Sequence, residues 1–311
     1  DHQDHRRVLL PAFSAKAIEK WLPITRDICN ELLDEFAENG SCDASESYAK
    51  HIPVKVIARM IGIPEEDGDM FRRWVYELLE AGPTDVKLAT KATYEVFEYF
   101  GTFIESRRND PRDDILTYLL EADMNGKPLD DRQISGGLFL LLLAGIDTTW
   151  GTIGSSILHL SQNTEDRRRL VNDPEAMDNA VEEFLRFYSP VSMARVVTNE
   201  VEISGTTLCP GQRVMLPFAS ANRDPEFLAD AEEFQISREV NRHSAFGLGI
   251  HRCLGSNLAR MEIKVALEEW LKRVPEFELT DSNKVTWAGG PVRGPRSIPL
   301  TWEASQENPV K

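Results

Sequence analysis

The stretch Ser244–Arg260 reads SAFGLGIHRCLGSNLAR and places one cysteine among glycines, directly before a helical pattern. Gly247, Gly249 and Gly255 can adopt positive φ angles and let the backbone approach a flat ligand closely. A cysteine at the start of a helix meets unpaired backbone N–H groups and the positive end of the helix dipole. Both favour the thiolate, which is the form that binds metals. The stretch predicts either a thiolate metal ligand or a buried structural cysteine in a glycine-rich turn.

Upstream of this stretch, Asp130–Leu160 predicts the most informative helix of the chain. Its first half is apolar nearly all round, which indicates a buried helix. Its middle contains Gly145, Asp147 and Thr148 among small and hydroxyl residues. A threonine hydroxyl in a helix often bonds to the carbonyl four residues earlier, and the helix can open into a niche if that carbonyl is engaged elsewhere. The alternative is that Asp147 is exposed and the threonines only bend the helix.

Between these two stretches, Glu183 and Arg186 stand three residues apart on one face of a predicted helix. Taken alone, such a pair is usually an exposed ion pair that contributes less than about 1 kcal/mol.

The rest of the chain predicts a mainly α protein with small β-sheets, organised as one domain over residues 1–311. Further helices are predicted at Ile18–Ala37, Val54–Ile63, Phe71–Leu79, Tyr94–Ile104, Ile115–Leu120 and Ser256–Arg273. After Pro190 the pattern becomes strand-like, with a strand expected over Arg195–Ile203, a short strand over Val214–Leu216 and several short strands in the tail Phe277–Trp302.

The composition excludes several classes of protein. Acidic residues outnumber basic ones by 51 to 35, for a formal charge of −16, which argues against nucleic acid and anionic membranes as partners. None of the four cysteines stands in a C-x-x-C pair, so a reduced, cytoplasmic setting is expected. The apolar run Leu138–Ala144 is too short to span a bilayer, so we expect no membrane segment in this chain. The first residues, DHQDHRR, contain no initiator methionine, so we expect that N-terminal sequence is missing.

Three motifs together resemble the cytochrome P450 family. Phe246, Gly249, Cys253 and Gly255 match the haem-binding pattern F-x-x-G-x-x-x-C-x-G at every fixed position. The stretch Ala144–Thr149, AGIDTT, is similar to the family's A-G-x-D-T-T on its long central helix, and Glu183 with Arg186 is similar to its E-x-x-R. The motifs occur in the family's order. The resemblance implies the cytochrome P450 fold, one large helical domain with small β-sheets.

The resemblance also implies the cofactor and its surroundings. The cofactor is haem b (iron protoporphyrin IX), with the Cys253 thiolate as ligand of the iron. The cofactor-binding residues that it implies are His2, Arg6, Ala144, Gly145, Arg195, Phe246, Gly247, His251, Cys253 and Gly255, with His243 as a weaker candidate. Among them, His2, Arg6, Arg195 and His251 would bind the haem carboxylates, which need cationic or hydrogen-bonding partners. Arg238 would complete a structural network with Glu183 and Arg186.

The implied activity is that of a haem-thiolate monooxygenase, which inserts one oxygen atom from dioxygen by hydroxylation or oxidative dealkylation. Asp147 and Thr148 would relay protons during oxygen activation. The substrate pocket would include Val191, Ala194 and Val292, whose small or apolar side chains suggest a small apolar organic substrate, although core packing explains them equally well.

Electrons would come from a ferredoxin-type redox partner or from a fused reductase. Arg7, Arg252, Arg260 and Lys264 form a plausible basic docking patch on an otherwise acidic protein.

Three alternatives stay open at this point. A peroxide-driven haem-thiolate enzyme needs no redox partner, but it would lack the acid–alcohol pair that Asp147 and Thr148 form. A haem-binding sensor would need no oxygen-activating residues and no open apolar pocket. A helical scaffold without a cofactor would leave all three motifs unexplained.

Overall fold

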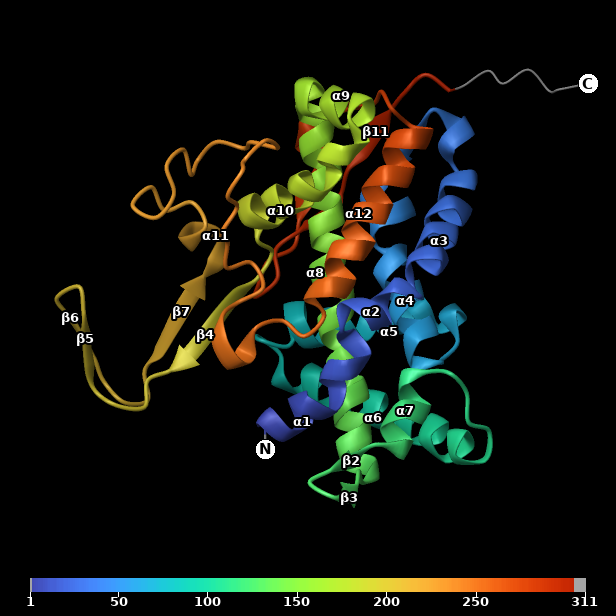
Figure 1. Cartoon of the computed structure of the whole chain (residues 1–311), viewed down its shortest axis with the longest axis vertical. Coiled ribbons are helices and arrows are strands. Elements are labelled where there is room, and N and C mark those ends of the chain that lie inside the picture. The colour runs from blue at the N-terminus through green and yellow to red at the C-terminus, as the bar shows by residue number, and fades with distance from the viewer. Residues whose placement is uncertain (1, 305–311) are drawn as a thin grey trace, which may run out of the picture.

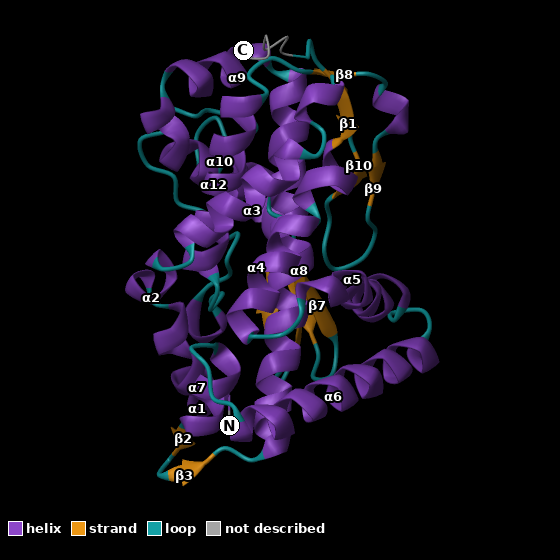
Figure 2. Ribbon diagram, turned by 90° about the vertical axis from the view of Figure 1, so that its right-hand side faces the viewer, coloured by secondary structure: helices purple, strands orange, loops and turns teal. Residues whose placement is uncertain are grey.

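The computed structural model describes residues 2–304 and is mainly helical, with short strands at its edges (Figures 1 and 2). The helices are α1 (His2–Leu9), α2 (Ala15–Glu19), α3 (Leu22–Asp34), α4 (His51–Ile61), α5 (Gly68–Tyr76), α6 (Val86–Asn109), α7 (Ile115–Glu121), α8 (Asp131–Gln162), α9 (Thr164–Asn172), α10 (Met177–Tyr188), α11 (Phe218–Ala221) and α12 (Ser256–Arg273). The strands are β1 (Ser41–Asp43), β2 (Asp123–Met124), β3 (Lys127–Pro128), β4 (Ser192–Val196), β5 (Val201–Ile203), β6 (Thr206–Leu208), β7 (Arg213–Pro217), β8 (Glu278–Leu279), β9 (Thr286–Trp287), β10 (Pro295–Ser297) and β11 (Pro299–Thr301).

Helix α8 runs through the centre of the molecule (Figure 1). It begins at a capping box, in which Asp130 accepts the backbone N–H of Gln133 and the Gln133 side chain accepts that of Asp130. It packs against α4, α6, α10 and α12, and nearly every residue of its second half is buried. Its length and composition would also allow a membrane span, but its packing on all these helices is that of a core helix.

The strands form small antiparallel sheets that tie distant parts of the chain together. One sheet has the order β1-β11-β8, with Cys42 opposite Leu300, so the first part of the chain pairs with the C-terminal part. The two-stranded sheets β4–β7 and β5–β6 project to one side of the helices, to the left in Figure 1. The other pairs are β2–β3 and β9–β10.

The helical class and most helix positions are confirmed, and the helix predicted over Ser256–Arg273 has the bounds of α12. The prediction of one helix over Ile18–Ala37 is wrong, because the chain breaks between α2 and α3. Pro23 lies in the first turn of α3, where its missing N–H costs nothing, and it cannot continue a helix from α2. The strand predicted over Arg195–Ile203 is also split, because β4 pairs with β7 whereas β5 turns to pair with β6.

Candidate active site

Cys253 lies exposed at the end of a loop, between the short 3₁₀ turn Gly249–His251 and the start of α12. Its backbone N–H donates to the carbonyl of Phe246 at 2.7 Å, which closes the loop. Gly247 and Gly249 have φ angles of +67° and +68°, as predicted, and only glycine adopts this backbone conformation readily. A Cβ atom at Gly249 or Gly255 would meet no atom within 4 Å, so there is free space along the loop.

The electrostatics of Cys253 differ from the sequence-based expectation. Desolvation raises the pKa of its thiol, and the opposing effects of the Gly255 backbone N–H and of Arg6 and Arg260 do not outweigh it. The position at the start of α12 alone therefore does not favour the thiolate, contrary to the expectation from the sequence. A coordinated metal would remove the proton, because its charge is the largest in such a site.

Four of the predicted haem-binding residues gather beside this loop. The rings of His2, on α1, and His251 lie 4.3 Å apart between centroids. The pKa of His251 is lowered, first by reduced solvation and then by the charges of His2, Arg195 and Arg6. No ion pair with a carboxylate occurs for any of the four within residues 2–304. Two arginines and two hydrogen-bonding histidines without an acidic partner fit an anionic ligand, and the two carboxylates of haem have this chemistry.

Helix α8 is largely buried, but one stripe of its surface is open. Leu140, Ala144 and Thr148 follow one another at four-residue spacing, and Leu140 is 53% exposed. In the Cys253 loop, Leu248 is 75% exposed and Ile250 is 57% exposed. Apolar side chains left open on two separate elements fit a flat apolar group, so the described residues fit haem at both its apolar faces and its carboxylates.

The structure separates the two residues predicted to relay protons. Asp147 is 1% exposed and its Oδ1 lies 2.6 Å from Nη2 of Arg296, whereas Thr148 lies on the open stripe. Arg296 also pairs with Glu80 at 2.5 Å and lies over the Trp150 ring at 4.0 Å. Burial raises the pKa of Asp147 and Arg296 opposes that rise. Asp147 is therefore held toward a charged site on another face of α8.

That charged site is a partly open cavity of about 420 Å³. Its lining comprises Glu46, Lys50, Asp69, Arg72, Arg73, Val75, Tyr76, Glu80, Ile146, Asp147, Trp150 and Arg296. Neither carboxylate oxygen of Asp147 receives a well-oriented hydrogen bond within the described residues, so both can accept one from water in the cavity.

Sequence reasoning missed Arg296 and Glu80, because both lie far from Asp147 along the chain. Arg296 reaches α8 because the segment before it packs directly against α8 where Gly294 meets Gly151. A Cβ atom at Gly294 would come within 2.4 Å of the Gly151 Cα atom. The small residues of α8 were a signal for this close approach, but they do not identify the segment that makes it.

Two details of α8 differ from the expectations. A Cβ atom at Gly145 would face Ile57 of α4 at 3.5 Å, so Gly145 borders the contact with α4, and Ala144 is the residue on the open stripe. The Thr148 hydroxyl donates to the carbonyl of Ala144 at 2.8 Å, and α8 is continuous there. The condition for an opened helix is therefore not met.

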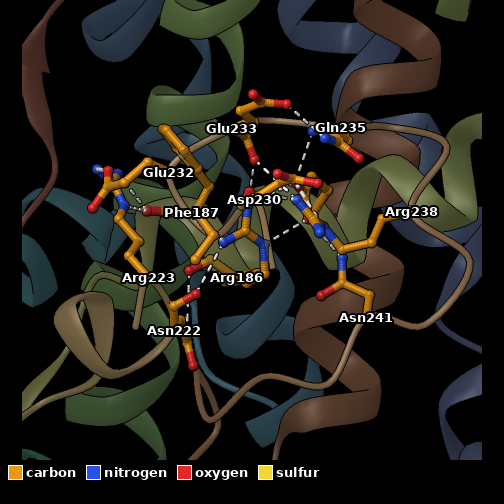
Figure 3. A network of polar contacts seen from close by, with 12 residues as sticks. Arg186, Phe187, Asn222, Arg223, Asp230, Glu232, Glu233, Gln235, Arg238 and Asn241 are labelled. Carbon is orange, nitrogen blue, oxygen red and sulfur yellow. Dashed lines mark hydrogen bonds and ion pairs between the residues drawn. The ribbon is translucent and has the colours of Figure 1, made fainter. Parts of the chain in front are cut away.

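The structure brings Glu183, Arg186 and Arg238 together in a buried network, and Figure 3 shows Arg186 and Arg238 within it. Arg186 donates to both oxygens of Glu183 at 2.8 Å, and both side chains are 0% exposed. Arg186 also donates to the carbonyls of Asn222, Ala231 and Glu233. This is a core network that orders residues 222–241, and the exposed-pair alternative does not hold.

The predicted pocket and docking residues lie in mixed surroundings. Val191 and Val292 bridge each other, and Val292 is buried, whereas Ala194 is exposed. Of the predicted docking patch, Arg7 pairs with Asp4, Arg260 with Glu182, and Lys264 with Asp178. Only Arg252 among the four is exposed without an ion pair in the described residues, so the patch is less basic than the sequence suggested.

Comparison with known proteins agrees with this geometry. The family description "Cytochrome P450" matches residues 77–286. The polyketide biosynthesis cytochrome P450 PksS of Bacillus subtilis is 35% identical over 305 residues, which cover 97% of this chain and 75% of that protein. A steroid C26-monooxygenase of Mycobacterium tuberculosis is 33% identical over 290 residues, covering 91% of this chain and 78% of that protein.

The fold of a solved relative is also the same. The crystal structure of CYP109E1 from Bacillus megaterium in complex with testosterone has a TM-score of 0.90 and 35% identity, and the match covers 96% of this chain and 80% of that one. The family, the fold and the monooxygenase activity predicted from the motifs are thereby confirmed. The chain therefore belongs to the cytochrome P450 family of haem-thiolate monooxygenases.

Proposed function

We propose that residues 1–311 form a single haem-binding domain in which Cys253 is the thiolate ligand of haem b. The observation that carries this assignment is the gathering of two arginines and two histidines beside the free space along the Cys253 loop, with no carboxylate paired to them in the described residues: Arg6, Arg195, His2 and His251. When bound, the haem supplies the activation of dioxygen and the transfer of one oxygen atom to the substrate. Phe246, Gly247, Gly255 and Ala144 line the cofactor.

The test is the optical spectrum of the dithionite-reduced protein with carbon monoxide. A thiolate-ligated haem gives a strongly red-shifted Soret band, and we expect Cys253→Ala to abolish it. Cys209→Ala is the matched control, because Cys209 is also an exposed free cysteine but lies at the β6–β7 turn. A red-shifted band that survives in Cys253→Ala would contradict the assignment.

Asp147 and Thr148 supply the protons of the reaction in this proposal. Asp147 exchanges protons with water in the charged cavity, and Arg296 holds the carboxylate in that position. The Thr148 hydroxyl lies on the open stripe and positions water beside the substrate site. Arg296 must release Asp147 for the proton to pass toward Thr148, because the two groups point to different faces of α8.

Two substitutions test the proton route. Asp147→Asn removes the titrating group, and we expect substrate turnover to fall by about 10²-fold or more, the range of general acid–base catalysis. Arg296→Gln keeps Asp147 but frees it, so turnover should change less and its dependence on pH should shift. A turnover rate unchanged in Asp147→Asn at every pH would exclude this role.

We propose an apolar substrate, held near Ala144, Val191, Ala194 and Val292. Support comes from Leu140 and Ala144 on the open stripe of α8, and from relatives named for steroid oxidation and for testosterone binding. A spin-state shift on titration with steroids, and none with polar analogues, would support the substrate class. Electrons come from a ferredoxin-type partner or a fused reductase, and the protein works in the cytoplasm. Arg252 is the exposed cation at which an acidic redox partner would dock. Added salt should then slow reduction by the partner, and a reduction rate that does not fall with salt would argue against this docking role.

A further inference from the structure

Glu182 and Glu183 are neighbours on α10, but they belong to different networks. Glu183 holds the segment 222–241, as described above. Glu182 instead contacts Arg260 of α12 and His243 of the loop that leads to Cys253. These two partners lie 78 and 61 residues away along the chain. None of the roles derived so far uses Glu182.

The contacts of Glu182 form a clamp, a name used here for Glu182, His243 and Arg260. The Arg260 guanidinium donates to both oxygens of Glu182, with Nε to Oε1 at 2.5 Å and Nη2 to Oε2 at 2.9 Å. His243 Nε2 lies 3.0 Å from Oε2, and its Nδ1 accepts the backbone N–H of Ala245 at 3.2 Å. A proton on Nε2 and a free lone pair on Nδ1 satisfy both contacts of this ring.

The carboxylate of Glu182 is charged at any working pH. Burial raises its pKa, but the hydrogen bonds from Arg260 and His243 outweigh that effect and lower the pKa to about 2. Both side chains of the Glu182–Arg260 pair are less than a third exposed. Charge-assisted, bidentate bonds of this kind are among the stronger ones in proteins.

The clamp reaches the cysteine through one aromatic ring. The Arg260 guanidinium lies over the Phe246 ring at 4.5 Å, and the ring of His243 lies 6.2 Å from the same ring. Phe246 in turn accepts the backbone N–H of Cys253 at 2.7 Å. A continuous path of contacts therefore runs from Glu182 through Arg260 and His243 to Phe246, and from Phe246 to Cys253.

We propose that Glu182 is a positioning residue for the active-site thiolate, which acts through Arg260 and His243 on Phe246 and so fixes the loop that carries Cys253. Without the carboxylate, Arg260 loses the group that holds it over the Phe246 ring, and the loop gains freedom. This inference rests on the assignment of Cys253 as the ligand. It also gives Arg260 a role inside the protein, where the sequence suggested a docking role at the surface.

The test compares Glu182→Gln with Asp178→Asn in the haem-loaded protein. Asp178 is a matched control, since it also joins α10 to α12, through an exposed ion pair with Lys264, but lies outside the path to Phe246. Two properties are measured: hydrogen exchange of the backbone amides from Phe246 to Cys253, and the thiolate band of the reduced carbon monoxide complex. In Glu182→Gln we expect about tenfold or faster exchange at the Cys253 amide and loss of part of the thiolate band. In Asp178→Asn both should stay as in the native protein.

Exchange and spectrum unchanged in Glu182→Gln would overturn the proposal. Should Glu182→Gln fail to retain haem, Arg260→Lys decides, because it keeps the charge but loses the planar fork and the ring contact. The same local changes are expected there, and a native-like loop would overturn the proposal. If the native protein itself gives no thiolate band, the assignment of Cys253 fails, and the exchange measurement still shows whether Glu182 orders the loop.

Discussion

Glu182 and Glu183 are consecutive residues of one helix, and the regions that they hold differ in burial. The Glu183 side chain is 0% exposed and receives hydrogen bonds from Arg186, Gln235 and Asn241, with Arg238 close by. The Glu182 side chain is 28% exposed and has two charged or polar partners. Helix α10 therefore holds the buried network through Glu183 and the half-buried clamp through Glu182. The same residue type therefore contributes less to stability where solvent can replace its partners.

The largest effect is expected for Glu183→Gln. This substitution leaves the buried Arg186 guanidinium without its carboxylate, which costs about 3–5 kcal/mol. Denaturant unfolding of the haem-loaded protein at pH 7 measures the loss. A loss no larger than that of Glu182→Gln would contradict the greater contribution of the buried Glu183 network.

A smaller effect is expected for Arg238→Lys. The Arg238 side chain reaches Glu183 and the carbonyls of Ala229, Asp230 and Glu233 at once. Lysine cannot make this planar set of bonds, so we expect a loss of about 1–3 kcal/mol. Limited proteolysis should show earlier cleavage within residues 222–241, and equal cleavage rates would contradict the role of Arg238.

Glu182→Gln is expected to cost about 1–2 kcal/mol at pH 7. Because His243 and Arg260 lower the folded-state pKa of Glu182 from 4.5 to about 2, its contribution is complete above pH 4.5. The contribution is lost as the pH falls from 4.5 toward 2. The difference in unfolding free energy between the native protein and Glu182→Gln should therefore be smaller at pH 3 than at pH 7. A difference that is equal at both pH values would mean that the charge of Glu182 has no part in it.

The smallest effect is expected for Asp178→Asn. Its ion pair with Lys264 spans 2.7 Å between side chains that are 75% and 37% exposed. Pairs in such surroundings contribute less than about 1 kcal/mol and are screened by salt. Unfolding at low and high salt should show that the small loss disappears as salt is added. A loss that persists at high salt would mean that the Asp178–Lys264 pair is as shielded from solvent as the pair of the clamp.

The helices could be predicted where the signal is local. The apolar run after Asp130 predicted α8, and the pattern of Ser256–Arg273 predicted α12. The break between α2 and α3 was missed because the apolar periodicity continues across Pro23, although the proline interrupts the backbone hydrogen bonds. The strands were predicted only in outline, because strand pairing depends on segments that lie far apart, as Cys42 and Leu300 do.

The family, the cysteine loop and the E-x-x-R pair could be predicted from the sequence, because they depend on short motifs whose residues keep a fixed spacing along the chain. The partners of these residues depend on the tertiary structure. It placed Arg296 against Asp147, turned Gly145 toward Ile57, and joined Glu182 to Arg260 and His243. The physical reason is that an ion pair or a close contact depends on how helices pack, and residues brought together from distant segments leave no periodic signal in the chain.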